Sequence, residues 1–213
     1  MKERIEKVMT NLRRNRMEAY FVPQLSDVLP LVESMIAKGD TVAVGGSATL
    51  DQAGVIDRLR EGEYRFLDRY DPDLTPDQRV EVLRDSAKAD VYLTSSNAIT
   101  EHGELYNVDG RGNRVAAISF GPKSVIVVVG VNKIVKDINE AIRRVKTIAA
   151  PLNAKRLHCD TYCCRIGHCQ GLDGGMTDGC SSPARICSHY LISGMQRDAN
   201  RIKVILVGEE CGF

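Results

Sequence analysis

The stretch SVIVVV at residues 124–129 decides the fold class, because it is apolar at every position after Ser124 and rich in valine. β-Branched residues favour strands, and a strand without polar alternation is typical of one covered on both faces. Such strands occur mainly in parallel sheets with helices packed on each side. The stretch therefore predicts a central strand of an α/β fold.

Strand and helix patterns alternate on both sides of this stretch. Further strands are predicted at residues 18–22, 41–44, 64–67, 91–94, 97–100, 105–108 and 202–207. Helices with apolar residues at three- and four-residue spacing are predicted at residues 5–12, 26–38, 48–60, 75–87 and 135–152, the second capped by Ser26. The alternation predicts a mostly parallel sheet with helices on both faces. A chain of 213 residues fits a single α/β domain, 1–213.

Charge and hydropathy exclude several classes of protein. The chain has 29 Lys and Arg against 28 Asp and Glu, and a net charge of +1 gives no global field that would attract nucleic acid. Its longest uncharged apolar stretch, residues 124–132, is much shorter than the ~20 residues of a membrane-spanning helix. We therefore expect no nucleic-acid partner and no membrane span. The first residues show no signal-peptide pattern, which indicates a cytoplasmic protein.

A glycine turn follows the predicted strand at 41–44. Gly45, Gly46, Ser47 and Thr49 stand between this strand and a helix, where free backbone donors and hydroxyl groups favour an anion. The alternative is a purely structural turn with Ser47 as the helix cap. Neither the lysine of a P-loop nor the glycine spacing of a dinucleotide fingerprint is present. Because ligands of open α/β sheets bind at the carboxyl ends of strands, we expect a small anionic metabolite here.

The segment NAITEHGELYNVDGRGNR at residues 97–114 places many polar side chains on short elements between strands. We expect Glu101, Asn97 and Arg114 to lie in the same cleft as the glycine turn. A carboxylate beside an imidazole, here Glu101 and His102, can act as a general acid or base, and a carboxylate can also be a nucleophile. The alternative is that these are solvated loop residues.

All seven cysteines lie between Cys159 and Cys211. This clustering indicates one local thiol site and not disulfides spread over a secreted fold. Residues 158–198 are also rich in glycine and poor in apolar periodicity, and are predicted to form a Cys-rich metal-binding insertion before the last strand. Four thiolates suit an iron–sulfur cluster or a tetrahedral zinc ion. The absence of any CxxC pair favours a [4Fe–4S] cluster, with zinc as the alternative metal. Free buried thiols are the remaining alternative. The expected ligands are Cys163, Cys169, Cys180 and Cys187.

Several motifs together resemble a known family. These are VAVGGSATL at 42–50, residues 97–122 from NAITEHG to SFGP, VIVVVGVNKIV at 125–135, and a late cysteine cluster that ends in SSPARIC at 181–187. They resemble the lactate-utilization (LUD) domain family, in its single-domain, cysteine-containing type, over nearly the whole chain. The resemblance implies a fold like that of the CoA-transferase and ribose-5-phosphate isomerase superfamily. It also implies a link to bacterial L-lactate oxidation alongside iron–sulfur proteins.

The resemblance also bears on single residues. Thr100–Gly103 is similar to the Ser-Glu-Asn-Gly stretch of class I CoA transferases, with Glu101 in the place of their nucleophilic glutamate, although Thr and His replace Ser and Asn. The four cysteines named above match a set in single-domain relatives. Because residues 170–179 look like an insertion, Cys164 can take the place of Cys163.

Three functions follow as expectations. The first is a redox or accessory component of organic-acid metabolism that carries a Cys-ligated metal or iron–sulfur site and works with iron–sulfur partner subunits. The second is an enzyme of the CoA-transferase or sugar-phosphate type that uses Glu101. The third is a partner protein in which the cysteine site staples a loop or senses redox state.

Overall fold

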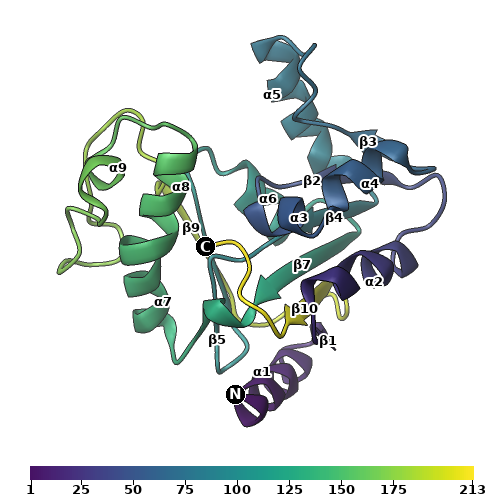
Figure 1. Cartoon of the computed structure of the whole chain (residues 1–213), viewed down its shortest axis with the longest axis horizontal. Helices are drawn as coiled ribbons and strands as arrows, with labels where there is room; N and C mark the ends of the chain where they lie inside the picture. The colour runs from purple at the N-terminus through teal and green to yellow at the C-terminus, as the bar shows by residue number, and fades with distance from the viewer.

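A six-stranded sheet forms the centre of the protein, in a computed structural model that describes residues 1–213 (Figure 1). Every pair of neighbouring strands in it is parallel. The strand order is β1 (Glu18–Val22), β10 (Ile202–Val207), β7 (Ser124–Gly130), β4 (Val91–Thr94), β2 (Thr41–Val44) and β3 (Arg65–Leu67). The predicted α/β class with a mostly parallel sheet is confirmed.

The valine-rich strand β7 supplies side chains to the cores on both faces of this sheet. Val125, Val127 and Val129 pack on one face, while Ile126 and Val128 pack on the other, and all five are fully buried. The first face is covered by α1 (Lys2–Arg14) and α6 (Asn113–Ser119), and the second by α2 (Val28–Ser34), α3 (Ala48–Gln52) and α4 (Val55–Glu61). Burial on two faces explains why β7 carries no polar alternation.

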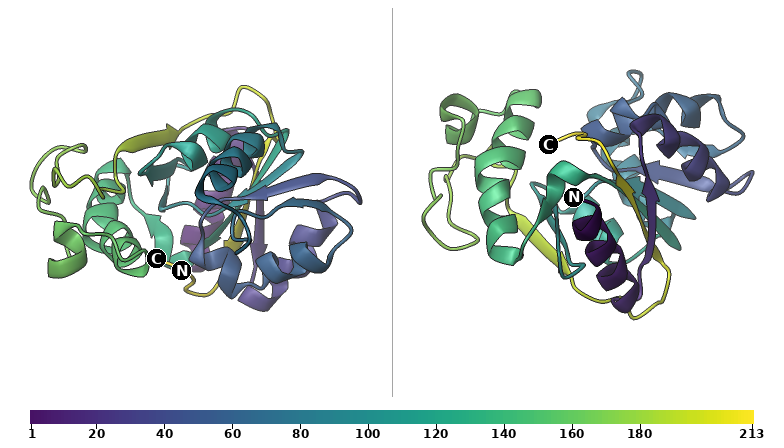
Figure 2. Two further views of the ribbon diagram at one scale, coloured as in Figure 1. Left: turned by 90° about the horizontal axis from the view of Figure 1, so that it is seen from above. Right: turned by 60° about the horizontal axis from the view of Figure 1, so that its bottom comes forward.

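A second, four-stranded sheet was not predicted. Its order is β8 (Ile134–Val135), β5 (Ala98–Thr100), β6 (Leu105–Asp109) and β9 (His189–Ser193), with antiparallel pairs between β5, β6 and β9. One of its faces packs into the core of the large sheet through Ile99 and Leu105. Its other face packs through Tyr106 and Val108 against a long helical column, which the right view of Figure 2 shows along its length in green.

This column joins α7 (Ile138–Arg144), a π-helical turn at Val145–Ala149 and α8 (Ala150–Arg156) into one helical run. The remaining elements are α5 (Pro76–Asp85), α9 (Tyr162–Ile166) and 3₁₀ turns at Leu25–Asp27, Ser86–Lys88 and Val131–Lys133. None of the helices has the length and hydrophobicity that a membrane crossing requires.

Three predicted helices differ from the observed ones. Ser26 caps no helix, because a 3₁₀ turn closed by Gln24 and Asp27 precedes α2. The helix predicted at 48–60 is broken by Gly54, whose positive φ of 69° ends α3 and starts α4. The helix predicted from Val135 begins at Ile138, because Val135 pairs in β8.

The Cys-rich segment 158–198 contains regular secondary structure. It contains α9 and β9, and β9 pairs with β6. Cys187 therefore precedes a strand of the second sheet, and the last strand of the chain, β10, follows only after another connection. Strand β9 was not predicted because its short sequence, HYLIS, stands in a segment with little apolar periodicity, and it is ordered by pairing with β6.

Candidate functional site

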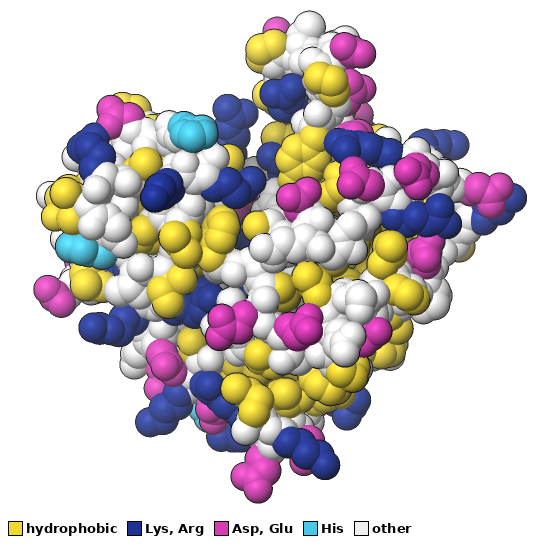
Figure 3. Space-filling view, viewed as in Figure 1, with side chains coloured by type: hydrophobic (Ala, Val, Ile, Leu, Met, Phe, Trp, Pro, Cys, Tyr) yellow, Lys and Arg dark blue, Asp and Glu magenta, His cyan; other side chains and the backbone are white.

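A cleft of about 290 Å³ lies at the carboxyl edge of the six-stranded sheet. It faces α8 and the loop after β6, and Figure 3 shows Lys and Arg side chains around the hollow in this region. Parallel strands deliver their following loops to the same edge, so segments distant in the chain meet here. The loops after β2, β4 and β7 contribute Gly46, Ser47, Thr49, Ser95, Ser96, Asn97 and Lys133.

The glycine turn takes part in this cleft in two different ways. A Cβ on Gly45 would stand 2.9 Å from Thr94 Oγ1 and 3.1 Å from Arg114 Cδ, so Gly45 permits close packing behind the turn. A Cβ on Gly46 would meet nothing closer than 3.9 Å, because this residue faces the open cleft. Ser47 caps α3 by accepting a hydrogen bond from the Leu50 amide at 3.2 Å.

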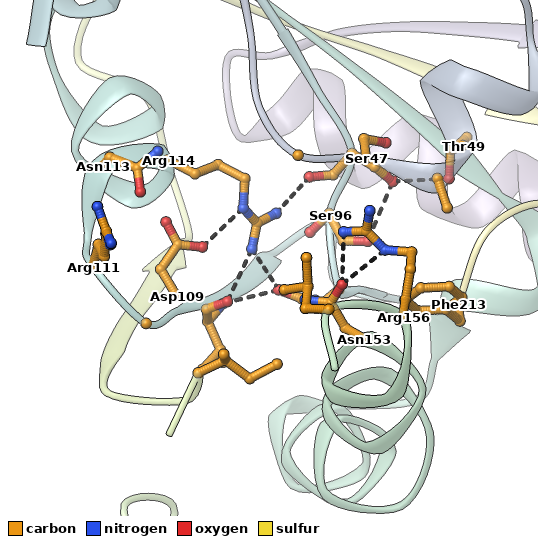
Figure 4. Close-up of a pocket in the computed structure, with 18 of the residues that line it drawn as sticks. Ser47, Thr49, Ser96, Asp109, Arg111, Asn113, Arg114, Asn153, Arg156 and Phe213 are labelled. Carbon is orange, nitrogen blue, oxygen red and sulfur yellow. Dashed lines mark hydrogen bonds and ion pairs between the residues drawn. The ribbon is translucent and has the colours of Figure 1, made fainter. Parts of the chain in front are cut away.

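Arg114 lies at the centre of the cleft wall, as Figure 4 shows, and its guanidinium is saturated by protein groups. Nε donates to Asp109 Oδ1 at 2.8 Å. The remaining bonds go to the oxygens of Ser95, Asn107, Asn97 and Val108, at 2.7–3.0 Å. Because a guanidinium has five N–H donors and five bonds are made, Arg114 offers an anion its charge but no free donor.

Three other arginines line the cleft without an acidic partner. Arg111 lies on the loop after β6, Arg156 on α8, and Arg69 beside the ring of Tyr70. Arg156 hydrogen-bonds only to the neutral amide oxygen of Asn153, at 2.8 and 3.1 Å. The one acidic residue of the cleft, Asp109, is paired with Arg114. The lining therefore carries a strong excess of positive charge.

A buried lysine completes the lining. Lys133 is 2% exposed, and its Nζ donates to Thr49 Oγ1 at 2.9 Å and Ser95 Oγ at 3.0 Å. It forms no ion pair, so nothing compensates fully for the loss of hydration of the ammonium group. The pKa of Lys133 is lowered to about 7, mainly by burial; Cys211 opposes this shift, and the positive charges of Arg144 and Arg114 add to it.

Glu101 does not lie in this cleft, so the prediction of a shared site is wrong. Its carboxylate forms ion pairs of 2.8 Å with Arg4 and Lys7 of α1. Asn11 of the same helix donates to the Glu101 carbonyl at 2.7 Å, and Asn15 to the His102 carbonyl at 2.9 Å. These bonds from Lys7 and Arg4 hold the pKa of Glu101 below its usual value. The turn between β5 and β6 thus anchors α1, and His102 is exposed beside it.

The approach of α1 to this turn is close enough to require glycine. A Cβ on Gly103, whose φ is +79°, would stand 2.7 Å from backbone atoms of Asn11 and Leu12. The Glu101–Gly103 motif therefore has a packing role in this fold. An enzyme that uses Glu101 as nucleophile or base in the anion cleft is not compatible with this geometry.

The four predicted cysteine ligands line one small cavity on the far side of α8. Cys163 and Cys169 are buried, whereas Cys180 and Cys187 are half-buried. Burial raises the pKa of the Cys187 thiol, and the neighbouring Cys169 and Cys180 add to this effect against Arg185, which opposes it. Cys164 lies outside this cavity. No group of three or more His, Cys, Asp or Glu side chains is arranged to hold a single metal ion.

Two basic side chains organise the loop that carries these thiols. Lys146 of the π-helical turn is buried and donates to the carbonyls of Gly171, Gly174 and Gly175. Arg185 donates to the carbonyls of Cys187, Cys180 and Thr177 at 2.6–3.0 Å. Satisfying the carbonyls of a glycine-rich loop in this way supplies part of the order that its few apolar contacts do not provide.

Part of the cleft was predicted from the sequence, but four of its five basic residues were not. The structure brings Gly46, Ser47, Thr49, Asn97 and Arg114 together at one edge. Lys133 was not predicted, although its position in the turn that follows the strand 124–129 places it at the carboxyl edge of the sheet, where ligands bind. Arg111 lies inside the segment 97–114 and was open to the same reasoning. Arg69 and Arg156 carry no sequence signal, because only the tertiary fold brings them to this edge.

Comparisons with known proteins agree with the motifs. A family model described as LUD domain matches residues 5–207. Among solved structures, the chain is similar to a DUF162 family protein from Deinococcus radiodurans, with 17% sequence identity and a TM-score of 0.47. That similarity covers 96% of this chain and 94% of the other. A comparison with curated proteins gave no match.

The two glycines of the turn provide a matched pair of substitutions. We expect Gly45→Ala to lower the free energy of unfolding by about 1–3 kcal/mol, because its methyl group would press on Thr94, Arg114 and Tyr92 in a packed region. Gly46→Ala, with no contact under 3.9 Å, should change it by about 0.5 kcal/mol or less. Urea denaturation measures both. Equal losses in the two variants would contradict the assigned roles.

Glu101→Gln tests the anchoring of α1 through its pH dependence. A carboxyl whose pKa is lowered by folding adds stability above its unfolded pKa of about 4.3, and this stability is lost as the pH falls through the folded pKa. The wild type should therefore exceed Glu101→Gln in unfolding free energy at neutral pH, and the difference should vanish in acid. Glu6→Gln, on the same helix but exposed, without an ion pair and beyond the first turn, is the control. A difference independent of pH would contradict the electrostatic role.

Proposed function

Since the chain belongs to the LUD domain family of lactate-utilization-type proteins, we propose that it serves organic-acid metabolism by binding a small anionic metabolite in the basic cleft. The family supports the metabolic setting, and the cleft supports the ligand class. A cleft of about 290 Å³ suits a small metabolite better than a large cofactor.

One observation carries this proposal: four basic side chains line the cleft without an acidic ion-pair partner, because the only acidic side chain of the lining, Asp109, is paired with Arg114. These four side chains are Arg69, Arg111, Lys133 and Arg156. Uncompensated charge in a concave, partly dry site is costly for a protein to keep, and an anionic ligand relieves that cost. Arginine also presents paired donors that match a carboxylate or phosphate. The short helix α3, with five residues, adds little, so the side chains supply most of the attraction.

We expect L-lactate and inorganic phosphate, used as probes in isothermal titration calorimetry, to bind more weakly to the double variant Arg111→Gln/Arg156→Gln. The Kd should rise about tenfold or more, because each charge-assisted hydrogen bond contributes about 1.5–3 kcal/mol. Binding to the wild type should also weaken with added sodium chloride, which screens the charges at the cleft mouth.

The matched control is Arg14→Gln/Arg84→Gln, which removes the same charge from α1 and α5 outside the cleft. It should bind both probes as the wild type does. An equal loss of affinity in the control variant would show that only the net charge of the protein matters, which would contradict binding in the cleft. Absence of binding to the wild type would overturn the proposed ligand class.

A second proposal concerns the cysteine cavity, because all four predicted ligands line it. Cys163, Cys169, Cys180 and Cys187 would hold a [4Fe–4S] cluster, in which each thiolate binds a different iron and the sulfurs need not converge on one point. A single zinc ion would require three or four of these thiols to move together. Bound there, a cluster would supply one-electron transfer, which suits a redox or accessory component with iron–sulfur partner subunits.

Anaerobic reconstitution with iron and sulfide tests the cluster. We expect about four irons and four sulfides per chain, with the optical and Mössbauer signatures of a [4Fe–4S] centre, and loss of iron after serine substitution of any one of the four cysteines. Cys164→Ser, which alters the adjacent residue outside the cavity, should retain the cluster. Stoichiometric zinc in the purified protein with no uptake of iron would overturn the cluster in favour of the alternative metal.

A further inference from the structure

Lys133 is the most unusual side chain of the cleft. The 3₁₀ turn Val131–Lys133 follows β7 directly, so the carboxyl end of the central strand fixes the backbone of this lysine. The side chain is 2% exposed but still lines the cleft. A flexible surface lysine would be spread over many rotamers, whereas this amine is held by two hydrogen bonds at one place.

The partners of the amine are hydroxyl groups and not carboxylates. Thr49 Oγ1 and Ser95 Oγ accept from Nζ at 2.9 and 3.0 Å, and no acidic group lies within 4 Å. The charged and titratable groups that act on it are Arg114 and Arg144, which disfavour the ammonium form, and Cys211, which favours it. With a pKa of about 7, a large share of this amine is unprotonated at neutral pH.

An unprotonated amine in a cleft that attracts anions is suited to one kind of chemistry. Lysines with lowered pKa form Schiff bases with carbonyl compounds. The free arginines of the same cleft would hold the anionic group of such a compound, which leaves its carbonyl carbon for the amine. The hydroxyl groups of Thr49 and Ser95 can pass protons between nitrogen and oxygen.

We propose that Lys133 forms a Schiff base with an aldehyde or ketone that carries a carboxylate or phosphate group, an inference that rests on the proposed anion cleft. Nζ attacks the carbonyl carbon, and a C–N bond forms as the C=O π electrons move to oxygen. A proton transfers from nitrogen to this oxygen, which gives a carbinolamine. The C–O bond then breaks, and water leaves with one added proton as the nitrogen lone pair forms the C=N bond of a protonated imine.

Reductive trapping tests the proposal. The full-length protein is incubated with pyruvate or with dihydroxyacetone phosphate, and with sodium cyanoborohydride, and labelled peptides are located by mass spectrometry. We expect labelling at Lys133 about tenfold faster than at any surface lysine, whose pKa of about 10.4 leaves little free amine at neutral pH. The rate should rise with pH and level off above about 7–8, at the pKa of Lys133. Preference for one probe identifies the anionic group, and acetone, which has none, should label far less.

Two variants complete the experiment. Lys133→Met should lose the fast label, and Lys155→Met, on the exposed surface of α8, should keep it. Circular dichroism checks that each variant is folded, and the wild-type peptide map is decisive even if Lys133→Met does not fold. Calorimetric binding of both probes without a preferred label at Lys133 overturns this inference and leaves the anion cleft intact. Absence of both binding and labelling overturns the cleft as well.

Discussion

The guanidinium of Arg114 is the interaction on which the site depends, because it joins the two sheets where the cleft forms. Its bonds reach Ser95 and Asn97 after β4 of the large sheet and Asn107, Val108 and Asp109 on β6 of the small one. The Arg114 and Asp109 side chains are only 11% and 8% exposed, so removing either one would leave the other as a buried charge without a partner. Gly45 is part of the same arrangement, since only a residue without Cβ lets the Arg114 stem pass.

A second buried arginine supports the cleft from the opposite side. Arg144 of α7 donates to the carbonyls of Asn97 at 2.7 Å and Asn132 at 3.2 Å, and so ties the loops after β4 and β7 to the helical column. Arg114 has no free donor and Arg144 is buried and bonded to two backbone carbonyls, so both act as fixed positive charges. Their presence beside Lys133 favours the neutral amine, while the arginines at the cleft mouth remain available to a ligand. The arginines that hold the loops of the site in place are thus different from the arginines that can bind a ligand.

The sequence predicted the large sheet well because each of its strands carries its own signal. β7 is apolar on both faces, and β2, β4 and β10 are short apolar runs bounded by turns or charges. The small sheet was missed because β9 depends on pairing with β6 and not on its own pattern. Glu101 was misplaced for a related reason: a short turn between two strands can face either end of a sheet, and only the docking of α1 decides which. The saturation of Arg114 likewise depends on five partners that no local pattern reveals.

The helical column links the two proposed sites in space. Its C-terminal part directs Asn153 and Arg156 into the anion cleft, while the π-helical turn and its neighbours direct Val145, Lys146 and Ala150 toward the cysteine cavity. The loop before β9 does the same with adjacent residues, since Ile186 lines the cleft and Cys187 lines the cavity. A π-helical turn is a costly irregularity that is frequently found at functional sites. Here the π-helical turn carries Lys146, which donates to the glycine-rich loop, and Arg156 of the same helical run lines the cleft.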